Sequence, residues 1–407
     1  MPLIVQKYGG TSVGDLERIA NVARRTAKCH DEGNRTVVVL SAMSGETDRL
    51  INMAKKIDKV PNDREMDVLV STGEQVTIAL LAITLEAMGY KARSYCGWQI
   101  PLVTDGASGS ARIQEAKPES ILKDLDAGYI VVVAGFQGVD ADGNITTLGR
   151  GGSDTSAVAV AAALKADRCE IYTDVDGVYT TDPNITSKAR KLARIGFEEM
   201  LEMASLGAKV LQIRAVELAM LYSVPLLVKS SFTDGEGTLV TQEDDDMERE
   251  VVRAVTCNTK EAKVTIKGLK DQPGVAARVF SLLAEANIVV DMIVQNISAA
   301  GVTDITFTIP EAELAKTLQI CEGLRGTLGA QDVIGSNDIA KVSIVGAGMH
   351  SHSGVASKMF WALADEGINI ELISTSEIKI SCVIKAKYAE LAARALHEVF
   401  DLGRRPV

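Results

Sequence analysis

Residues 3–12 read Leu3-Ile-Val-Gln-Lys-Tyr-Gly-Gly-Thr-Ser12, an apolar run that leads into two glycines. The run from Leu3 to Val5 predicts a buried strand, and a helix is expected to begin near Asp15. Paired glycines between a strand and a helix let the backbone approach a ligand, with N–H groups that can bind phosphate oxygens. Lys7 adds a mobile positive charge. A plain tight turn is the alternative for the glycines alone.

The chain continues to about residue 240 with alternating strand and helix patterns. The strand patterns are the β-branched runs 37–40, 130–133 and 225–228, and helical patterns cover residues 16–23 and 68–88. This alternation predicts an α/β domain over residues 1–240, with a largely parallel sheet between helical layers.

Composition limits the function and the compartment. A length of 407 residues predicts two to three domains, and a net charge of −11 argues against binding to nucleic acid or to an anionic membrane. The six cysteines form no C-x-x-C pair, and no signal peptide or run long enough to span a bilayer is visible. We therefore expect a cytoplasmic protein with reduced thiols and no membrane segment.

The second half of the chain contains an internal repeat. Lys263-Val-Thr-Ile-Lys-Gly268 matches Lys341-Val-Ser-Ile-Val-Gly346, and each copy continues through a glycine, Gly274 or Gly354, directly before a helical pattern. Each copy predicts a ferredoxin-like βαββαβ module. The expected domains are 263–338 and 339–407, preceded by an acidic linker with a leading strand over residues 241–262.

Four further motifs combine glycine or hydroxyl groups with charged side chains, in the stretches 41–47, 71–75, 148–155 and 172–183. Each has a plain structural alternative: a polar loop, a capping box, a capped helix or turns. Three glycines around Arg150 favour anion binding, and the acidic strand end in 172–183 could hold nucleotide hydroxyls or help to place Mg²⁺. The four histidines predict no metal site.

Together these segments closely resemble the aspartokinases of the amino acid kinase family, over essentially the whole chain. The resemblance implies an amino acid kinase fold followed by two ACT domains. It also implies transfer of the ATP γ-phosphate to the β-carboxylate of L-aspartate, with Mg²⁺, giving 4-phospho-L-aspartate for lysine, threonine and methionine biosynthesis. Tyr8 is a departure, since many relatives carry Phe there.

The resemblance assigns roles to the motif residues. Lys7 and the N–H groups of Gly9 and Gly10 would neutralise the transferred phosphoryl group, and Asp154 would orient Lys7. The implied aspartate site, in which Arg150 pairs with the α-carboxylate and Glu74 holds the ammonium, consists of Ser41, Thr47, Glu74, Arg150, Gly151, Gly152 and Ser153. The implied ATP site consists of Lys7, Tyr8, Gly9, Gly10, Thr173, Asp174, Tyr179, Thr180, Thr181, Asp182, Pro183 and Lys209.

The paired ACT domains imply feedback inhibition by lysine, threonine or both, and assembly of a homo-oligomer through these domains. The implied effector residues are Asp271, Gln272, Pro273, Gly274, Val275, Ala276, Val289, Val290, Asp291, Gln295, Ser353, Gly354, Val355, Asn369, Ile370 and Ser376. In some relatives an internal start yields a free regulatory subunit, and Met247 is the corresponding position here, which would give an α2β2 assembly.

Two other functions remain open from the sequence. The first is a kinase of the same family that acts on glutamate, acetylglutamate or a nucleotide, although the tandem ACT repeat and the stretch 71–74 disfavour it. The second is an amino-acid sensor whose kinase domain has decayed. A decayed kinase domain predicts loss of Lys7, Arg150 or Asp154, and all three are present.

Overall fold

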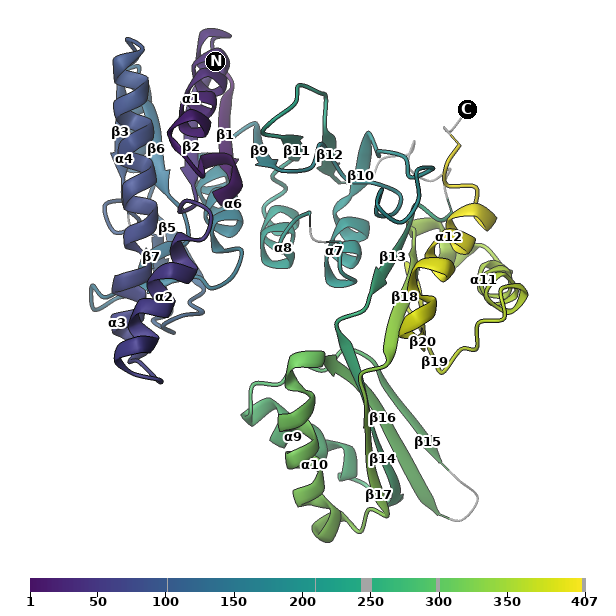
Figure 1. Cartoon of the computed structure of the whole chain (residues 1–407). Helices are drawn as coiled ribbons and strands as arrows, with labels where there is room; N and C mark the ends of the chain where they lie inside the picture. The colour runs from purple at the N-terminus through teal and green to yellow at the C-terminus, as the bar shows by residue number, and fades with distance from the viewer. Residues whose placement is uncertain (101, 209, 243–250, 298–300, 405–407) are drawn as a thin grey trace. The chain divides into compact units, whose positions relative to one another are not determined.

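The computed structural model describes residues 1–100, 102–208, 210–242, 251–297 and 301–404. The chain forms two compact units, each described below by itself (Figure 1). Unit one contains residues 1–178, 191–205 and 209–247, and unit two contains residues 179–190, 206–208 and 248–407. Unit two therefore includes two short stretches, 179–190 and 206–208, from within the expected catalytic domain.

Unit one is built on an eight-stranded sheet, ordered β10-β12-β11-β9-β1-β2-β6-β3. Its strands are β1 (Leu3–Tyr8), β2 (Arg35–Leu40), β3 (Ala92–Tyr95), β6 (Ile130–Ala134), β9 (Arg168–Thr173), β10 (Arg194–Gly196), β11 (Leu226–Ser230) and β12 (Thr238–Thr241). Every neighbouring pair runs parallel except β11 with β12. The predicted α/β fold class is confirmed, and the β-branched runs form the buried centre of this sheet.

Helices cover both faces of the sheet in Figure 1. The helices of unit one are α1 (Leu16–Asp31), α2 (Glu46–Ile57), α3 (Asp63–Val70), α4 (Thr72–Ala87), α5 (Glu119–Asp126), α6 (Gly152–Leu164), α7 (Phe197–Ser205) and α8 (Ile213–Leu221), of which α2 and α3 pack on each other. Helices α1 and α4 pack on each other and on β2, β3 and β6, whereas α6 packs on β1, β9 and α8. The helical stretch Asp63–Ala87 has the length and apolar composition of a membrane span, but half of its apolar window is buried inside the protein, as in a core helix.

A second, small sheet lies in unit one and was not predicted from the sequence. Its strands, in the order β5-β4-β7-β8, are β4 (Leu102–Thr104), β5 (Ile113–Ala116), β7 (Gln137–Val139) and β8 (Ile145–Thr147). Its strands are only three or four residues long, too short for a periodic pattern to be recognised. Strand β8 leads directly into the glycine-rich stretch before α6 and thereby positions it.

The first module of unit two has the predicted βαββαβ order. Its elements are β14 (Glu261–Lys270), α9 (Val275–Glu285), β15 (Ile293–Ile297), β16 (Val302–Pro310), α10 (Leu314–Leu328) and β17 (Asp332–Ser336). The sheet order is β15-β16-β14-β17, and the apolar faces of α9 and α10 bury one side of it. The core contains the residues that the repeat aligned, including Val264, Ile266 and Leu283.

The second module differs from the predicted plan at one strand. Its elements are β18 (Ile339–Val345), α11 (Val355–Asp365), β19 (Leu372–Thr375), β20 (Lys379–Lys385) and α12 (Ala389–Val399). No strand follows α12 up to residue 404, where the described part of the chain ends. Instead β13 (Ala254–Asn258) pairs with β18, in the place that β17 holds in the first module. The predicted second module, 339–407, is therefore incomplete, because the leading strand of the expected 241–262 segment pairs with it and the first module is inserted between the two.

Candidate active site

The site in unit one begins where β1 ends, with Lys7 and Tyr8 on opposite faces of the sheet. Successive side chains of a strand point to opposite sides. Tyr8 is fully buried, and its ring stacks on Tyr172 with the centroids 4.5 Å apart. Lys7 points the other way, where its Nζ lies 2.5 Å from Oδ1 of Asp154 on α6. The structure therefore brings Lys7 and Asp154 together and leaves Tyr8 only its backbone for a ligand.

Gly9 and Gly10 lie directly beside this ion pair. A Cβ at Gly10 would be 2.9 Å from the carbonyl oxygen of Ala42, so only glycine fits there. The backbone of Gly10 accepts a hydrogen bond from the N–H of Ser44, at 3.2 Å, and the N–H of Ser41 donates to the carbonyl of Tyr8 at the same distance. The two predicted loops, after β1 and after β2, are thus joined backbone to backbone.

Glu74 lies in the first turn of α4 and reaches the same loop. Its Oε1 accepts the N–H of Ala42 at 3.0 Å, while its buried Oε2 has no hydrogen-bond partner among the described residues. Burial raises the pKa of Glu74 to about 7. A buried carboxylate oxygen without a partner is costly, and an incoming ammonium group would satisfy it.

The capping-box alternative for Ser71 and Glu74 is wrong. The Ser71 hydroxyl donates to the carbonyl of Val68, at 2.9 Å, and makes no capping hydrogen bond to α4. The glutamate is therefore directed away from its own helix terminus, toward Ala42. Thr47 lies half-buried in the first turn of α2, on the loop that follows Ser41.

The glycine-rich stretch after β8 forms the start of α6. Gly151 is the N-cap residue, so the alternative that Asp154 or Thr155 caps this helix is wrong, and both lie inside its first turn. Ser153 is buried against Gly135. Arg150 is exposed and has no ion pair or hydrogen bond within the described ranges, which leaves its guanidinium available to a ligand carboxylate.

Two residues that the sequence analysis missed support these loops. Arg214 on α8 donates to the carbonyls of Leu148 and Ala111, at 2.6 and 2.9 Å, and so fixes the stretch before Gly149. Ser231 lies with its Oγ 2.5 Å from Oγ of Ser12. Ser231 follows a predicted strand, which is a usable signal for a site residue. Arg214 sits in a helical pattern that carries no such signal.

The predicted nucleotide stretch divides between the two units. Thr173 and Asp174 end β9 in unit one, where the Thr173 hydroxyl donates to Oδ1 of an exposed Asp174, at 3.1 Å. Residues 179–183 belong to unit two, in which Thr180 is fully buried and Asp182 is exposed. Lys209, the last predicted ATP residue, lies outside the described residues.

The predicted effector residues occupy equivalent places in the two modules of unit two. Gly274 and Gly354 are the N-cap residues of α9 and α11, each with φ of 92°, a backbone conformation that favours glycine. Residues 271–274 are exposed at the N-terminus of α9, as is Ser353 before that of α11, whereas the exposed Val289 and Asn369 follow the C-terminal ends of the same helices in the chain. Val275 and Val355 are buried in the module cores, where they pack rather than face a ligand.

One predicted effector residue is engaged by a lysine of the other module. Lys341 of β18 is 2% exposed, and it forms ion pairs with Asp291 and, at 2.5 Å, with Glu261. The two carboxylates raise the pKa of Lys341 against the effect of its burial. Asp291 is still partly exposed, so one carboxylate connects the effector residues of the first module to the core strand of the second.

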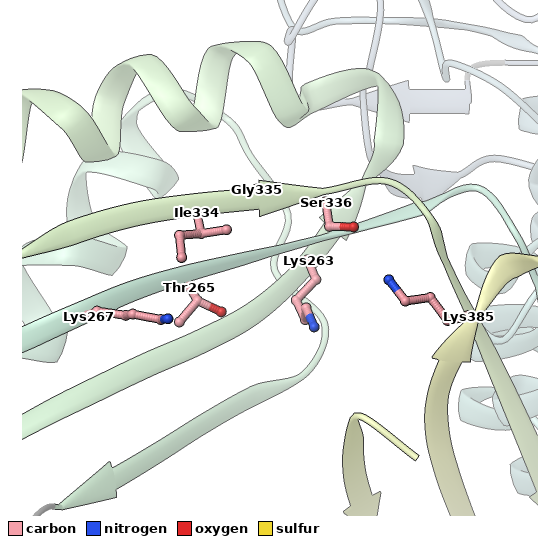
Figure 2. Close-up of a pocket in the computed structure, with 7 residues that line it drawn as sticks. All are labelled: Lys263, Thr265, Lys267, Ile334, Gly335, Ser336 and Lys385. Carbon is pink, nitrogen blue, oxygen red and sulfur yellow. The ribbon is translucent and has the colours of Figure 1, made fainter. Parts of the chain in front are cut away.

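Unit two also contains a pocket that none of the predicted sites includes (Figure 2). It is lined by Lys263, Thr265, Lys267, Ile334, Gly335, Ser336 and Lys385. Lys263 and Lys385 both form ion pairs with Glu371, and Lys385 also pairs with Asp338 at 3.5 Å, so two of its three cations already have carboxylate partners. The pocket is an open part of the sheet surface and does not belong to the candidate effector site.

Comparison with known proteins agrees with this architecture. A sequence model of the amino acid kinase family matches residues 2–230, and an ACT domain model matches residues 264–323 and 342–400. The aspartate kinase of Stutzerimonas stutzeri is 59% identical over 403 residues, covering 99% of this chain and 98% of the relative.

Solved structures extend the comparison. The crystal structure of E. coli aspartokinase III in complex with aspartate and ADP has a TM-score of 0.83 and 27% identity, covering 98% of this chain and 99% of that one. The complex of the same enzyme with lysine and aspartate has a TM-score of 0.79 and 28% identity, covering 97% and 99%. With its paired lysine and aspartate beside a double glycine and its two ACT modules, the chain belongs to the amino acid kinase family, among the aspartokinases.

Proposed function

We propose that this chain transfers the γ-phosphate of ATP to the β-carboxylate of L-aspartate and forms 4-phospho-L-aspartate, the first step toward lysine, threonine and methionine. The observation that carries the proposal is the convergence of two opposite charges on one pair of joined loops. Lys7 stands beside Gly9 and Gly10. Glu74 bonds the loop that Gly10 contacts through Oε1, and its buried Oε2 has no partner among the described residues. The first arrangement suits a phosphoryl group and the second an ammonium group.

The chemistry needs positioning more than it needs an activated nucleophile. An aspartate side chain is already ionised at neutral pH, so no general base is required. Lys7 neutralises charge on the transferring phosphoryl group, and its pairing with Asp154 keeps its ammonium group in one place. Arg150, exposed and unpaired among the described residues, is suited to the substrate α-carboxylate.

The residues of unit one fit a Mg²⁺ ion that arrives with the nucleotide. Mg²⁺ is usually held by one or two carboxylates together with substrate phosphates and water. Asp174, exposed at the end of β9, offers such a carboxylate, whereas no group of three His, Cys, Asp or Glu side chains converges in the described ranges. When bound, the ion would neutralise phosphate charge.

Regulation by lysine, threonine or both is part of the same proposal. The E. coli enzyme, which this chain resembles over its whole length, has been crystallised with lysine. In this chain each ACT module presents a helix N-terminus with a glycine N-cap, which can bind the carboxylate of an amino acid. Asp291, partly exposed in the segment that follows the C-terminal end of α9, carries a negative charge suited to an ammonium group.

The proposal is tested with the purified full-length chain, ATP and Mg²⁺. Aspartate, glutamate, N-acetylglutamate and a nucleoside monophosphate are offered separately, and an acyl phosphate is trapped with hydroxylamine as the hydroxamate. We expect turnover with aspartate and kcat/KM at least about a hundredfold lower with glutamate, since one added methylene misplaces the reacting carboxylate. Equal or better turnover with another acceptor would show that the aspartate assignment is wrong.

A further inference from the structure

A buried histidine of unit two contacts the stretch that is predicted to bind ATP. His397, on α12, is 2% exposed, and its Nε2 lies 2.9 Å from Oγ1 of the fully buried Thr180. The Thr180 hydroxyl oxygen also accepts a hydrogen bond from the backbone N–H of Arg190 at 2.9 Å. The hydroxyl proton is therefore left to be donated to the imidazole. Burial and the nearby Lys188 and Arg190 lower the pKa of His397, which keeps the ring neutral at pH 7 and able to accept.

Other contacts hold the same stretch, residues 179–190, on the second ACT module. The Thr180 carbonyl accepts the N–H of Val255 on β13 at 2.8 Å. Ile185 packs against the core of the module, and Lys188 forms an ion pair with Glu398, the neighbour of His397, at 3.2 Å. The stretch has no helix or regular strand of its own, so its conformation depends on these attachments.

The residues that follow Thr180 are the ones with polar groups suited to a nucleotide. Asp182 is exposed, and its Oδ1 is held by the backbone N–H of Asn184 at 2.8 Å, which fixes a turn. Thr180 itself has no exposed surface, so its hydroxyl serves the histidine and not a ligand. Thr180 therefore acts as an anchor. Thr181 is also buried, and the exposed Asp182 and Pro183 are the part that can face a nucleotide.

We propose that His397 is a positioning residue for ATP: through Thr180 it holds residues 181–183 in the conformation that binds the nucleotide, so that the second ACT module sets ATP affinity. This inference rests on the nucleotide assignment in the proposed function. The physical reason is the entropy of a loop. A loop that is already ordered in the free enzyme loses less conformational entropy when ATP binds. Without the anchor the loop has to become ordered on binding, and the affinity for ATP falls.

The test compares variants of the full-length enzyme that differ at this one contact. His397→Leu and Thr180→Val remove the hydrogen bond, whereas His397→Gln and Thr180→Ser keep a polar atom within reach. Ser381→Ala is the matched control, because it removes a buried hydrogen bond of 2.7 Å to Ser343 in the same module, without contact to residues 179–190. The measurements are the KM values for ATP and aspartate, kcat, and the Kd for ADP by calorimetry, alongside thermal melts.

We expect His397→Leu to raise the KM for ATP and the Kd for ADP about three- to tenfold, the size expected for one lost hydrogen bond. The kcat value at saturating ATP and the KM for aspartate should stay within about twofold. His397→Gln and Thr180→Ser should lose less ADP affinity than His397→Leu, and Ser381→Ala should resemble wild type. The double variant His397→Leu with Thr180→Val should bind ADP no worse than either single variant, because the two substitutions remove the same hydrogen bond.

An unchanged ADP affinity in His397→Leu would overturn the proposal, and so would an equal loss in Ser381→Ala, which would indicate general destabilisation. If His397→Leu fails to fold, Thr180→Val decides by the same criteria. A wild-type enzyme that binds ADP through this contact but does not phosphorylate aspartate would overturn the proposed function and leave this inference standing. If the wild type phosphorylates aspartate but the variants bind ADP normally, the proposed function stands and this inference is overturned.

Discussion

The ammonium nitrogen of Lys7 lies 2.5 Å from a carboxylate oxygen of Asp154, and the two residues come from different layers of unit one. Lys7 is the next-to-last residue of the central strand β1, whereas Asp154 is in the first turn of α6, which packs on that strand. Both side chains are almost buried. A buried cation with a fixed partner keeps its position, which is what electrostatic stabilisation of a transition state requires.

Lys7→Ala should lower kcat by at least about a hundredfold, because it removes the charge beside the transferred phosphoryl group. Lys117→Ala is the control, since it also removes a lysine that pairs with a carboxylate in unit one, Glu115 at 3.6 Å, outside the proposed site. Circular dichroism should show both variants folded. A Lys7→Ala enzyme that kept more than about a tenth of wild-type kcat would show that Lys7 does not act on the phosphoryl group.

Glu74 should make aspartate binding depend on pH near neutrality. Burial raises its pKa to about 7, and only the ionised form attracts the substrate ammonium group. As pH rises from about 6 to about 8, the ionised fraction and hence kcat/KM for aspartate should increase about tenfold. A steady-state pH profile checks this, and Glu74→Gln should have a low kcat/KM without that step. An identical step in Glu74→Gln would assign it to another group.

The same carboxyl group should make Glu74 unfavourable for stability at high pH. Its folded pKa lies above its unfolded value, so the native state binds its proton more tightly, and stability is lost as pH rises from about 4.5 to about 7. Glu74→Gln should therefore raise the free energy of unfolding at pH 8 by roughly 2 to 3 kcal/mol. Urea unfolding at about pH 4 should show little difference between the two proteins, since the wild-type group is then protonated in the folded state and mostly protonated in the unfolded state.

Lysine, threonine or the two together should inhibit the enzyme at saturating ATP and aspartate, and calorimetry should detect their binding. Asp291→Asn should weaken effector binding about tenfold, because it removes the charge that attracts an ammonium group. Glu322→Gln, an exposed carboxylate on α10 that pairs with Arg325, is the control and should leave inhibition unchanged. The regulatory proposal is wrong if neither amino acid, alone or mixed, alters activity or binds.

Lys341→Met should destabilise unit two by about 3 to 5 kcal/mol, because it leaves Glu261 and Asp291 without their buried cation. Lys263→Met is the control, since Glu371 keeps Lys385 as a second partner and the expected loss is about 1 kcal/mol. Urea unfolding of the full chain, followed by a probe in unit two, measures both. Equal losses would show that the depth of burial does not determine the energy of these pairs.

Met247 should act as an internal start that produces a separate regulatory chain in the native host. The residue lies outside the described part of the structure, so this prediction rests on the sequence. Immunoblotting with an antibody to the ACT modules should reveal two bands, and Met247→Leu should remove the smaller one. A single full-length band in the wild type would exclude the α2β2 assembly.

Much of the fold was predictable because it follows from local periodicity. The β-branched runs became the central strands of unit one, and the repeat became two modules with equivalent glycine N-caps at Gly274 and Gly354. The small sheet of β4, β5, β7 and β8 escaped prediction because its strands are too short to show a pattern. The place of β13 escaped because pairing with β18 joins residues far apart in the chain.

The candidate site divides in the same way. The sequence by itself determined which chemistry is present: the Lys7 charge beside two glycines, Glu74, Arg150, Asp154 and a pair of effector modules, since residue type and order carry that information. Only the tertiary structure decided which partners these groups have: that Lys7 meets Asp154, that Glu74 bonds Ala42 instead of its own helix, that Arg214 holds Leu148, and that His397 anchors Thr180. Those contacts depend on the packing of distant segments against one another, and a hydrogen bond forms between whichever groups that packing brings within about 3 Å.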